Sequence, residues 1–197
     1  MSGCPTGPRC ASAAGATSRW KTPEMATAAP GRIGPNALLQ LAPVLDAAGG
    51  RALRDAVFAA GGVDRLPEGT GLMEEGPAAA VHQALRARLP DRAAEIAAEA
   101  GRRTADYILA HRIPRPVQRL LKILPAGIAE RLLTRAIAQH AWTFAGSGRF
   151  RVASLTPLVF EIADNPIIRG EIADHPICHW HAAVFARLFQ ALVHPDA

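Results

Sequence analysis

Apolar residues recur with helical spacing along most of the chain. Positions three and four residues apart share one face of a helix, so this period predicts amphipathic helices packed on a core. The predicted helices cover residues 35–48, 51–60, 77–89, 90–111, 117–124 and 126–144. Glycine pairs end the first two, and prolines interrupt the later ones. The pattern therefore predicts a helical N-terminal half.

Two stretches within this half depart from the simple helical pattern. Residues 63–76 hold Pro67 and several glycines and are predicted as a loop. Along residues 90–111, small residues such as Ala97 and Gly101 recur, and they allow the backbone of a neighbouring helix to approach closely. We therefore expect this long helix to have a tightly packed partner.

The period changes after Gly146-Ser147-Gly148. Side chains alternate in residues 149–154, and a second short apolar run occupies residues 158–162 beyond Thr156-Pro157. Alternation of this kind is typical of strands. The two runs are close enough in sequence to pair antiparallel, and we predict two or three strands here.

The last patterned segment is residues 177–193. Its apolar residues follow four-residue steps through Trp180, Val184, Leu188 and Leu192, the stripe of a helix packed on a core. The chain is therefore predicted to have an α+β fold. It would consist of a helical N-terminal half, a small antiparallel sheet, and a C-terminal helix packed on that sheet.

Residues 161–181, EIADNPIIRGEIADHPICHWH, contain a repeat. The pattern Glu-Ile-Ala-Asp-x-Pro-Ile begins at Glu161 and again at Glu171. Each proline removes an amide donor and moves the preceding residue, Asn165 or His175, out of the helical region. Each copy is thus predicted to be an extended segment that ends in a turn.

Composition favours one globular domain. The chain has 197 residues, of which 49% are hydrophobic, enough to bury a core. Residues 1–34 are rich in Pro, Gly, Ala, Ser and Thr and have no apolar period, so they are predicted to be a disordered tail before a single domain at 35–197. Met25 is a candidate for the true start of the protein.

The net charge of +5 comes largely from the tail. Residues 1–34 hold four basic residues and one acidic residue, so the body has too small an excess for a predicted nucleic-acid footprint. Basic residues of the body do cluster, at Arg112, Arg115, Arg119, Lys122, Arg131 and Arg135. Two interpretations remain open: a solvated basic face, and a landing site for an anionic ligand or a membrane surface.

No targeting signal or nucleotide-binding motif is recognised in the sequence. No apolar run is long enough for a membrane span, and the N-terminus lacks the apolar centre of a secretory signal, so we expect a cytoplasmic protein. Cys4, Cys10 and Cys178 do not make a disulfide framework. Neither the dinucleotide fingerprint nor the P-loop motif occurs, so no nucleotide cofactor is predicted.

Metal-capable residues gather before the last helix, at His175, Cys178, His179 and His181. A thiolate with imidazoles is a familiar zinc set, but only Cys178 and His181 share a helical face, and no second cluster completes the ligands. A structural zinc is therefore not expected. A buried thiol with hydrogen-bonded histidines is the favoured interpretation, and a nucleophilic Cys178-His pair is the weaker alternative.

His140 shares a predicted stripe with Leu133, Ile137 and Phe144. On such a stripe it is either a satisfied core histidine or an axial ligand for a flat apolar cofactor between helices, because a neutral imidazole coordinates metals well. The sequence leaves both interpretations open.

The run from residue 150 to residue 193 resembles a known family. NPI-x-RGE from Asn165, HPICHWH from His175, and AAVFARLFQALV are similar to the C-terminal part of the 4-vinyl reductase domain, in particular its bacteriochlorophyll-biosynthesis J-protein branch (bacteriochlorophyll 4-vinyl reductase). The helical part from about residue 31 is similar in layout. Many members carry a second cysteine where this chain has Ile167-Ile168, so only Cys178 is carried over.

The resemblance implies an α+β ligand-binding fold similar to haem-nitric-oxide sensor domains. It also implies a role in bacteriochlorophyll synthesis, at the reduction of a ring vinyl group on a magnesium tetrapyrrole. Three functions follow: a tetrapyrrole carrier or delivery factor, which we favour, the vinyl reductase itself, and a non-catalytic dimeric adaptor. Other bacteriochlorophyll-biosynthesis enzymes are the expected partners, in the cytoplasm or at the periphery of the photosynthetic membrane.

The expected pigment site joins residues from several helices. Its members are His140, Cys178, Trp180, His181 and Phe185, with Arg115 and Arg119 near the propionates. His140 and His181 are the candidate axial ligands to the magnesium.

Overall fold

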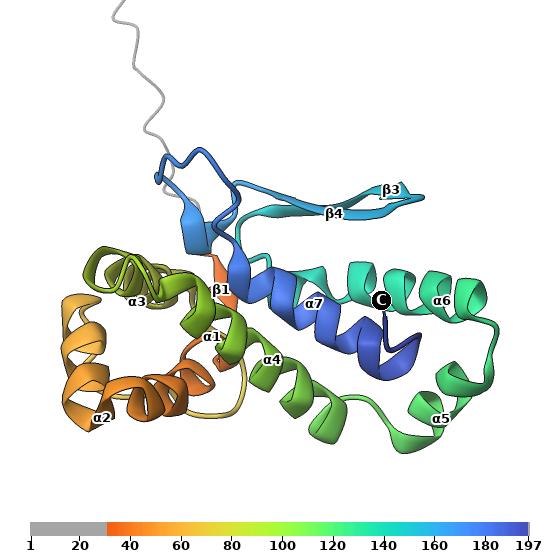
Figure 1. The fold of residues 1–197 in the computed structure, drawn as a ribbon, viewed down its shortest axis with the longest axis horizontal. Coiled ribbons are helices and arrows are strands. Elements are labelled where there is room, and N and C mark those ends of the chain that lie inside the picture. The colour runs from red at the N-terminus through yellow and green to blue at the C-terminus, as the bar shows by residue number, and fades with distance from the viewer. Residues whose placement is uncertain (1–30, 197) are drawn as a thin grey trace, which may run out of the picture.

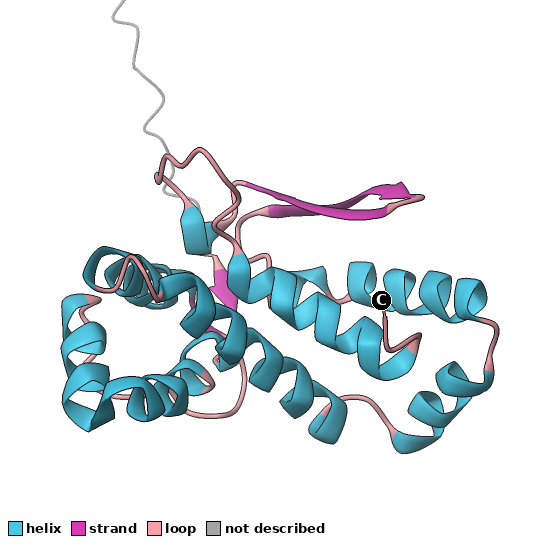
Figure 2. Cartoon of the chain, viewed as in Figure 1, coloured by secondary structure: helices cyan, strands magenta, loops and turns pink. Residues whose placement is uncertain are grey.

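A computed structural model describes residues 31–196, and the molecule is mainly helical with two small antiparallel sheets (Figures 1 and 2). The predicted α+β class is confirmed. Most of the expected tail, with Met25, lies outside the described residues. None of the described helices is both long enough and apolar enough to cross a membrane.

The helices largely follow the predicted segments. They are α1 Asn36–Leu39, α2 Leu41–Ala60, α3 Glu75–Arg88, α4 Ala93–His111, α5 Arg115–Ile123, α6 Ala126–Gln139 and α7 His179–Leu192, with single 3-10 turns η1 Ala141–Thr143 and η2 Pro166–Ile168. Within α2 the backbone leaves the helical region at Gly49 and Gly50, and Gly50 has a φ of 77°. The predicted break at this glycine pair is therefore confirmed as a sharp bend.

A two-stranded sheet near the N-terminus was not predicted. Strand β1 Arg32–Ile33 pairs antiparallel with β2 Met73–Glu74. The first strand falls at the end of the predicted tail and the second within the predicted loop. Ile33 is buried, which gives this short segment a hydrophobic reason to be ordered.

The second sheet is the predicted hairpin. Strand β3 Arg149–Leu155 pairs antiparallel with β4 Leu158–Ala163, and the register shifts between Val152 and Ser154. In Figure 1 the hairpin projects from the helical body as an arm above α6 and α7. Its inner phenyl rings, Phe150 and Phe160, contact Phe185 of α7. The prediction that the last helix packs on the sheet is confirmed.

Helix α7 also lies along α4 (Figure 1). The two backbones are so close that a Cβ atom at Gly101 would be 2.4 Å from the carbonyl oxygen of Trp180. Only glycine fits there, and the expected close partner of the long helix is α7. This helix is therefore held between α4 on one side and the hairpin on the other.

Candidate functional site

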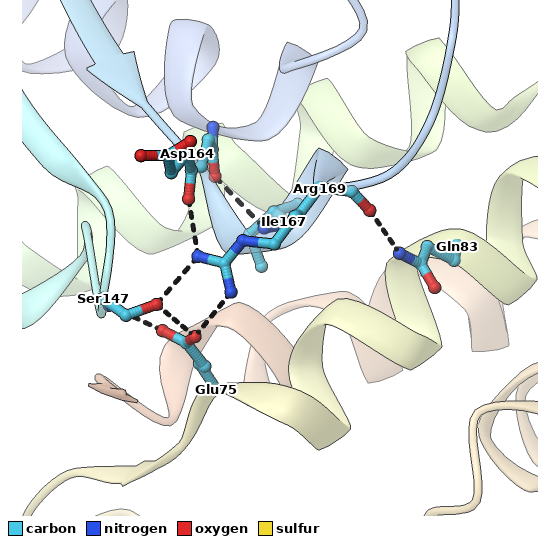
Figure 3. Close-up of polar contacts among 7 residues, drawn as sticks. Glu75, Gln83, Ser147, Asp164, Ile167 and Arg169 are labelled. Atoms are coloured by element: carbon cyan, nitrogen blue, oxygen red, sulfur yellow. Dashed lines mark hydrogen bonds and ion pairs between the residues drawn. The ribbon is translucent and has the colours of Figure 1, made fainter. Parts of the chain in front are cut away.

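The end of the first copy of the repeat and the residues just after it take part in a network of polar contacts (Figure 3). Asp164 adopts a left-handed backbone conformation with a φ of 54°, which turns the chain out of β4. Asn165 then caps η2, because its Oδ1 accepts a hydrogen bond from the Ile167 amide at 3.1 Å. Ile167 enters the core with 1% of its surface exposed.

Glu75, at the start of α3, is a buried carboxylate with its partners in place (Figure 3). Ser147 donates to it twice, from the amide at 2.7 Å and from Oγ at 2.5 Å. Arg169 donates to the same carboxylate at 3.2 Å, to Ser147 Oγ at 2.8 Å and to the Asp164 carbonyl at 2.6 Å. One carboxylate thereby joins α3, the turn before β3 and the segment after η2.

The surroundings of Glu75 favour its ionised form. Burial opposes ionisation, but the hydrogen bonds from Ser147 and the charge of Arg169 outweigh it and lower the pKa of the carboxyl below its ordinary value. Space is provided by glycines, because a Cβ at Gly31 or Gly146 would lie 2.1 Å from Glu75 Oε2. Gly146 also has a φ of 57°, a conformation that glycine adopts readily.

Helix α3 holds the segment at two further points. The guanidinium of Arg86 donates to Glu171 through Nε at 2.6 Å and Nη2 at 2.8 Å, and Nη2 also donates to the Ile167 carbonyl at 2.6 Å. One turn earlier, Gln83 donates to the carbonyl of Arg169 at 3.1 Å. The NPIIRGE stretch is thus fastened along its length.

Two imidazoles are buried beside this network. His181 of α7 lies with Nδ1 3.3 Å from the Asn165 amide nitrogen and Nε2 3.3 Å from the Phe144 carbonyl oxygen. His82 of α3 donates from Nε2 to the Ala37 carbonyl at 3.1 Å, and its Nδ1 has no partner among the described residues. Both buried rings are adjacent to Trp180.

Burial lowers the pKa of His82 and of His181 to about 4, against the weaker opposing effect of their backbone hydrogen bonds. Both rings are therefore neutral at neutral pH. Neutral imidazole is the form that coordinates a metal ion. His181 would have to release the Phe144 carbonyl to do so through Nε2.

An aromatic layer separates the hairpin from α7. We use this term for Phe144, Phe150, Phe160 and Phe185, whose neighbouring ring centroids are 5.1–5.3 Å apart. The rings meet edge to face or tilted, and each side chain is half-buried. His181 lies at the border of the layer, 6.1 Å from Phe144 and 6.4 Å from Phe185 between ring centroids. A neutral imidazole is therefore adjacent to an apolar cluster of aromatic rings.

Four of the predicted site residues come together here. Trp180 and His181 are buried in the first turn of α7, Phe185 follows one turn later, and Cys178 is the half-buried free thiol that precedes the helix. Phe185 belongs to the aromatic layer, His181 lies at its border, and Trp180 contacts His181.

The remaining predicted residues lie elsewhere. His140 is exposed, with Nδ1 2.8 Å from the Ala136 carbonyl, so its predicted place on a buried stripe is wrong. The helix expected to run to residue 144 ends at Gln139, and the change to η1 turns His140 outward. Arg115 and Arg119 are exposed on α5, which lies near the C-terminal end of α7 (Figure 1).

The metal-capable residues of the second copy do not converge. His175 is exposed with Nδ1 2.5 Å from Asp174 Oδ1, and His179 is half-buried. Within residues 31–196, no three His, Cys, Asp or Glu side chains are grouped so as to hold a metal ion.

Sequence reasoning missed Glu75, Ser147, Arg169 and His82. His82 alone had a signal, because it shares the buried stripe of α3 with Ala78 and Leu85. Glu75 stands in a polar, glycine-containing stretch that resembles any loop, and its partners come from distant segments.

Two curated proteins are similar to this chain. Bacteriochlorophyll synthase 23 kDa chain of Cereibacter sphaeroides is 54% identical over 164 residues, which cover 83% of this chain and 80% of the relative. The protein of the same name from Rhodobacter capsulatus is 50% identical over 165 residues, or 84% of this chain and 77% of the relative. No protein-family profile matches the chain. No solved structure matches it either.

Proposed function

Because the chain belongs to the family of the bacteriochlorophyll synthase 23 kDa chain, we propose that it binds a magnesium tetrapyrrole intermediate and holds it while another protein reduces a ring vinyl group. The family supports a role in bacteriochlorophyll biosynthesis. The ligand and the step rest on the resemblance to the 4-vinyl reductase domain together with the aromatic layer. The expected partners are other enzymes of the same biosynthesis.

The aromatic layer is the observation that carries this proposal. A flat macrocycle needs an apolar slot with a few polar groups at its border. The layer supplies phenyl rings from both sides, with Phe150 and Phe160 on the hairpin and Phe185 on α7. A two-stranded hairpin is only marginally stable by itself. A shift of this arm away from α7 would open the layer to a pigment ring.

His181 is the proposed magnesium-facing imidazole. It is neutral and buried beside the layer, and Asn165 fixes its ring through Nδ1. Coordination through Nε2 would replace its hydrogen bond to the Phe144 carbonyl and move the ring proton to Nδ1, where the Asn165 side chain would have to present its oxygen in place of its nitrogen. His140, Arg115 and Arg119 have no part in the proposed site, because each is exposed and lies outside the layer.

Titration of the apo-protein with magnesium protoporphyrin tests the binding. We expect quenching of Trp fluorescence and a Soret shift at micromolar pigment. Phe160→Ala should weaken binding by about tenfold or more, because a removed phenyl face is worth over 1 kcal/mol of contact. His140→Ala, at an exposed position, is the matched control and should bind as the parent does. An unchanged Soret band with the parent protein contradicts the proposal.

A turnover assay separates the carrier from a reductase. Vinyl reduction consumes two electrons and two protons, and a nicotinamide or flavin normally supplies them. Purified protein with NADPH or reduced flavin and a divinyl pigment is expected to yield no monovinyl product by itself. Product formation without another protein would identify the chain as the reductase and overturn the carrier role.

A further inference from the structure

Helix α5 presents an apolar side to solvent. Val117, Leu120 and Ile123 are 44%, 50% and 79% exposed. Their spacing of three residues places all three on one side of the helix. Leu121 alone among the residues of α5 is buried. Gln118 holds the helix in this orientation, because its Nε2 donates to the carbonyls of Leu109 at 2.6 Å and Ile113 at 2.8 Å. The outward apolar side is therefore a fixed feature of the fold.

The exposed apolar residues continue beyond α5. Ile128 and Leu132, in the first turns of α6, are 48% and 46% exposed. A cleft that joins the start of α6 to the tip of the hairpin follows, lined by Gly127, Glu130, Arg131, Leu155, Thr156, Pro157 and Leu158. In Figure 1, α5 and the start of α6 form the end of the molecule opposite α2. We call this end, residues 112–135, the α5–α6 end.

The charge of the α5–α6 end has one sign. Residues 112–129 contain four basic residues and no acidic residue, and Arg131 and Arg135 follow with Glu130 as the one acid up to residue 135. Arg115, Arg119 and Lys122 occupy the side of α5 opposite its apolar residues. Among the described residues, none of these three has a carboxylate within 4.0 Å, whereas Arg54, Arg86 and other arginines elsewhere are paired.

We propose that the α5–α6 end docks on the surface of an anionic lipid bilayer. A helix with a large apolar side and a basic polar side lies in the plane of a membrane interface, with its apolar residues at the boundary of headgroups and acyl chains. Val117, Leu120 and Ile123 would enter that boundary. The basic side chains extend toward the lipid phosphates, since their stems can lie along apolar surface while their charges stay in water.

The unpaired basic residues favour a membrane over a protein partner. A protein partner would need several acidic residues placed opposite α5, because charges across a protein interface are arranged to be complementary. An anionic bilayer supplies its negative charge everywhere and needs no such match. The inference does not depend on the proposed pigment site, because no residue of the aromatic layer belongs to the α5–α6 end.

Vesicle flotation with the full chain tests this inference. At low salt the protein should float with vesicles of phosphatidylcholine mixed with phosphatidylglycerol and should stay unbound with phosphatidylcholine alone. High salt should release it, because screening removes the attraction. Equal binding to both vesicle types, or binding to neither, overturns the proposal, and the second result would leave a protein partner as the occupant.

Variants locate the contact. Leu120→Asp with Ile123→Asp should abolish flotation, whereas Leu66→Asp, at another exposed apolar residue, should leave it intact. Arg119→Gln with Lys122→Gln should weaken binding by about fivefold for each charge removed. Circular dichroism should report the same helix content for all variants, since every changed side chain is exposed. Flotation of the Leu120→Asp, Ile123→Asp protein at the parent level would contradict the assignment.

Discussion

The two copies of Glu-Ile-Ala-Asp-x-Pro-Ile share six residues and differ in nearly everything else. In the first copy Ile162 is half-buried on β4, and Pro166 and Ile167 are fully buried. In the second, residues 172–177 have no regular secondary structure, and Ile172 is 102% exposed. The same short sequence is thus a core element in one place and a surface loop in the other.

The variable position accounts for part of this difference. Asn165 caps its own turn and contacts His181, so the first copy is fixed both locally and to α7. Within residues 31–196, His175 has a polar contact only with the adjacent Asp174, and both are exposed. A local motif therefore predicts the turn, and contacts with distant residues decide whether it is buried.

Removing the last isoleucine of each copy, Ile167 or Ile177, should give the largest contrast. Ile167→Ala deletes a side chain that is 1% exposed and should lower the free energy of unfolding by about 2–5 kcal/mol. Ile177→Ala, at the equivalent position of the second copy, shortens a half-buried side chain and should lower it by only about 1 kcal/mol. Urea unfolding of the two variants measures both values, and comparable losses would mean that the copies are equally buried.

Acid should act on His181, the buried imidazole that Asn165 of the first copy contacts. The pKa of His181 falls from 6.5 when exposed to about 4 in the folded protein, so the unfolded chain binds more protons between these values. The contribution of this pKa difference to the free energy of unfolding is complete above pH 6.5. It is lost as the pH falls toward about 4, by up to about 3 kcal/mol. His82 adds a loss of the same sign over the same range.

Unfolding at a series of pH values checks this expectation. His181→Gln should flatten the slope between pH 6.5 and 4. A steep slope that persists in His181→Gln with His82→Gln would assign the acid effect to other groups.

Substitution of the variable residue, Asn165 or His175, should also affect stability differently in the two copies, by a smaller margin than the isoleucines. Asn165→Ala leaves the Ile167 amide without its acceptor and His181 Nδ1 without its donor, which should lower stability by about 1–3 kcal/mol. His175→Ala changes an exposed side chain and should be neutral within about 0.5 kcal/mol. Thermal melts of both variants suffice. Equal melting temperatures would show that the cap does not distinguish the copies.

For the first glutamate of each copy, the substitution in the second copy should cost more stability than that in the first, by a modest amount. Glu171 makes a two-point contact with Arg86, and their side chains are 25% and 16% exposed. Glu161 pairs with Arg151 at the surface, where the side chains are 43% and 66% exposed. Glu171→Gln should therefore lower stability by about 1–2 kcal/mol, and Glu161→Gln by less than about 1 kcal/mol. High salt should reduce the second effect more than the first.

Features with a local physical cause could be predicted from the sequence. Apolar period with glycine and proline stops located the helices, and alternation located the hairpin. The helical spacing of residues 177–193 placed Trp180, His181 and Phe185 on one helix. Strand β1 was missed because two residues carry no period. The Glu75 network was missed because its members are 72 and 94 residues apart in sequence. His140 was misplaced because α6 ends at Gln139 and a single 3-10 turn follows. The apolar spacing in the sequence continues through this change and does not reveal it.

Amide hydrogen exchange, with and without magnesium protoporphyrin, tests the central claim most directly. In the apo-protein, Ile167 and Ile168 should exchange slowly, because their amides donate to Asn165, and residues 172–177 should exchange rapidly. Pigment should slow exchange in β3, β4 and the first turns of α7, and leave α2 unchanged. Rapid exchange throughout 165–169, or a pigment complex with no added protection in the hairpin, would contradict the claim that the first copy is a fixed anchor beside a pigment site.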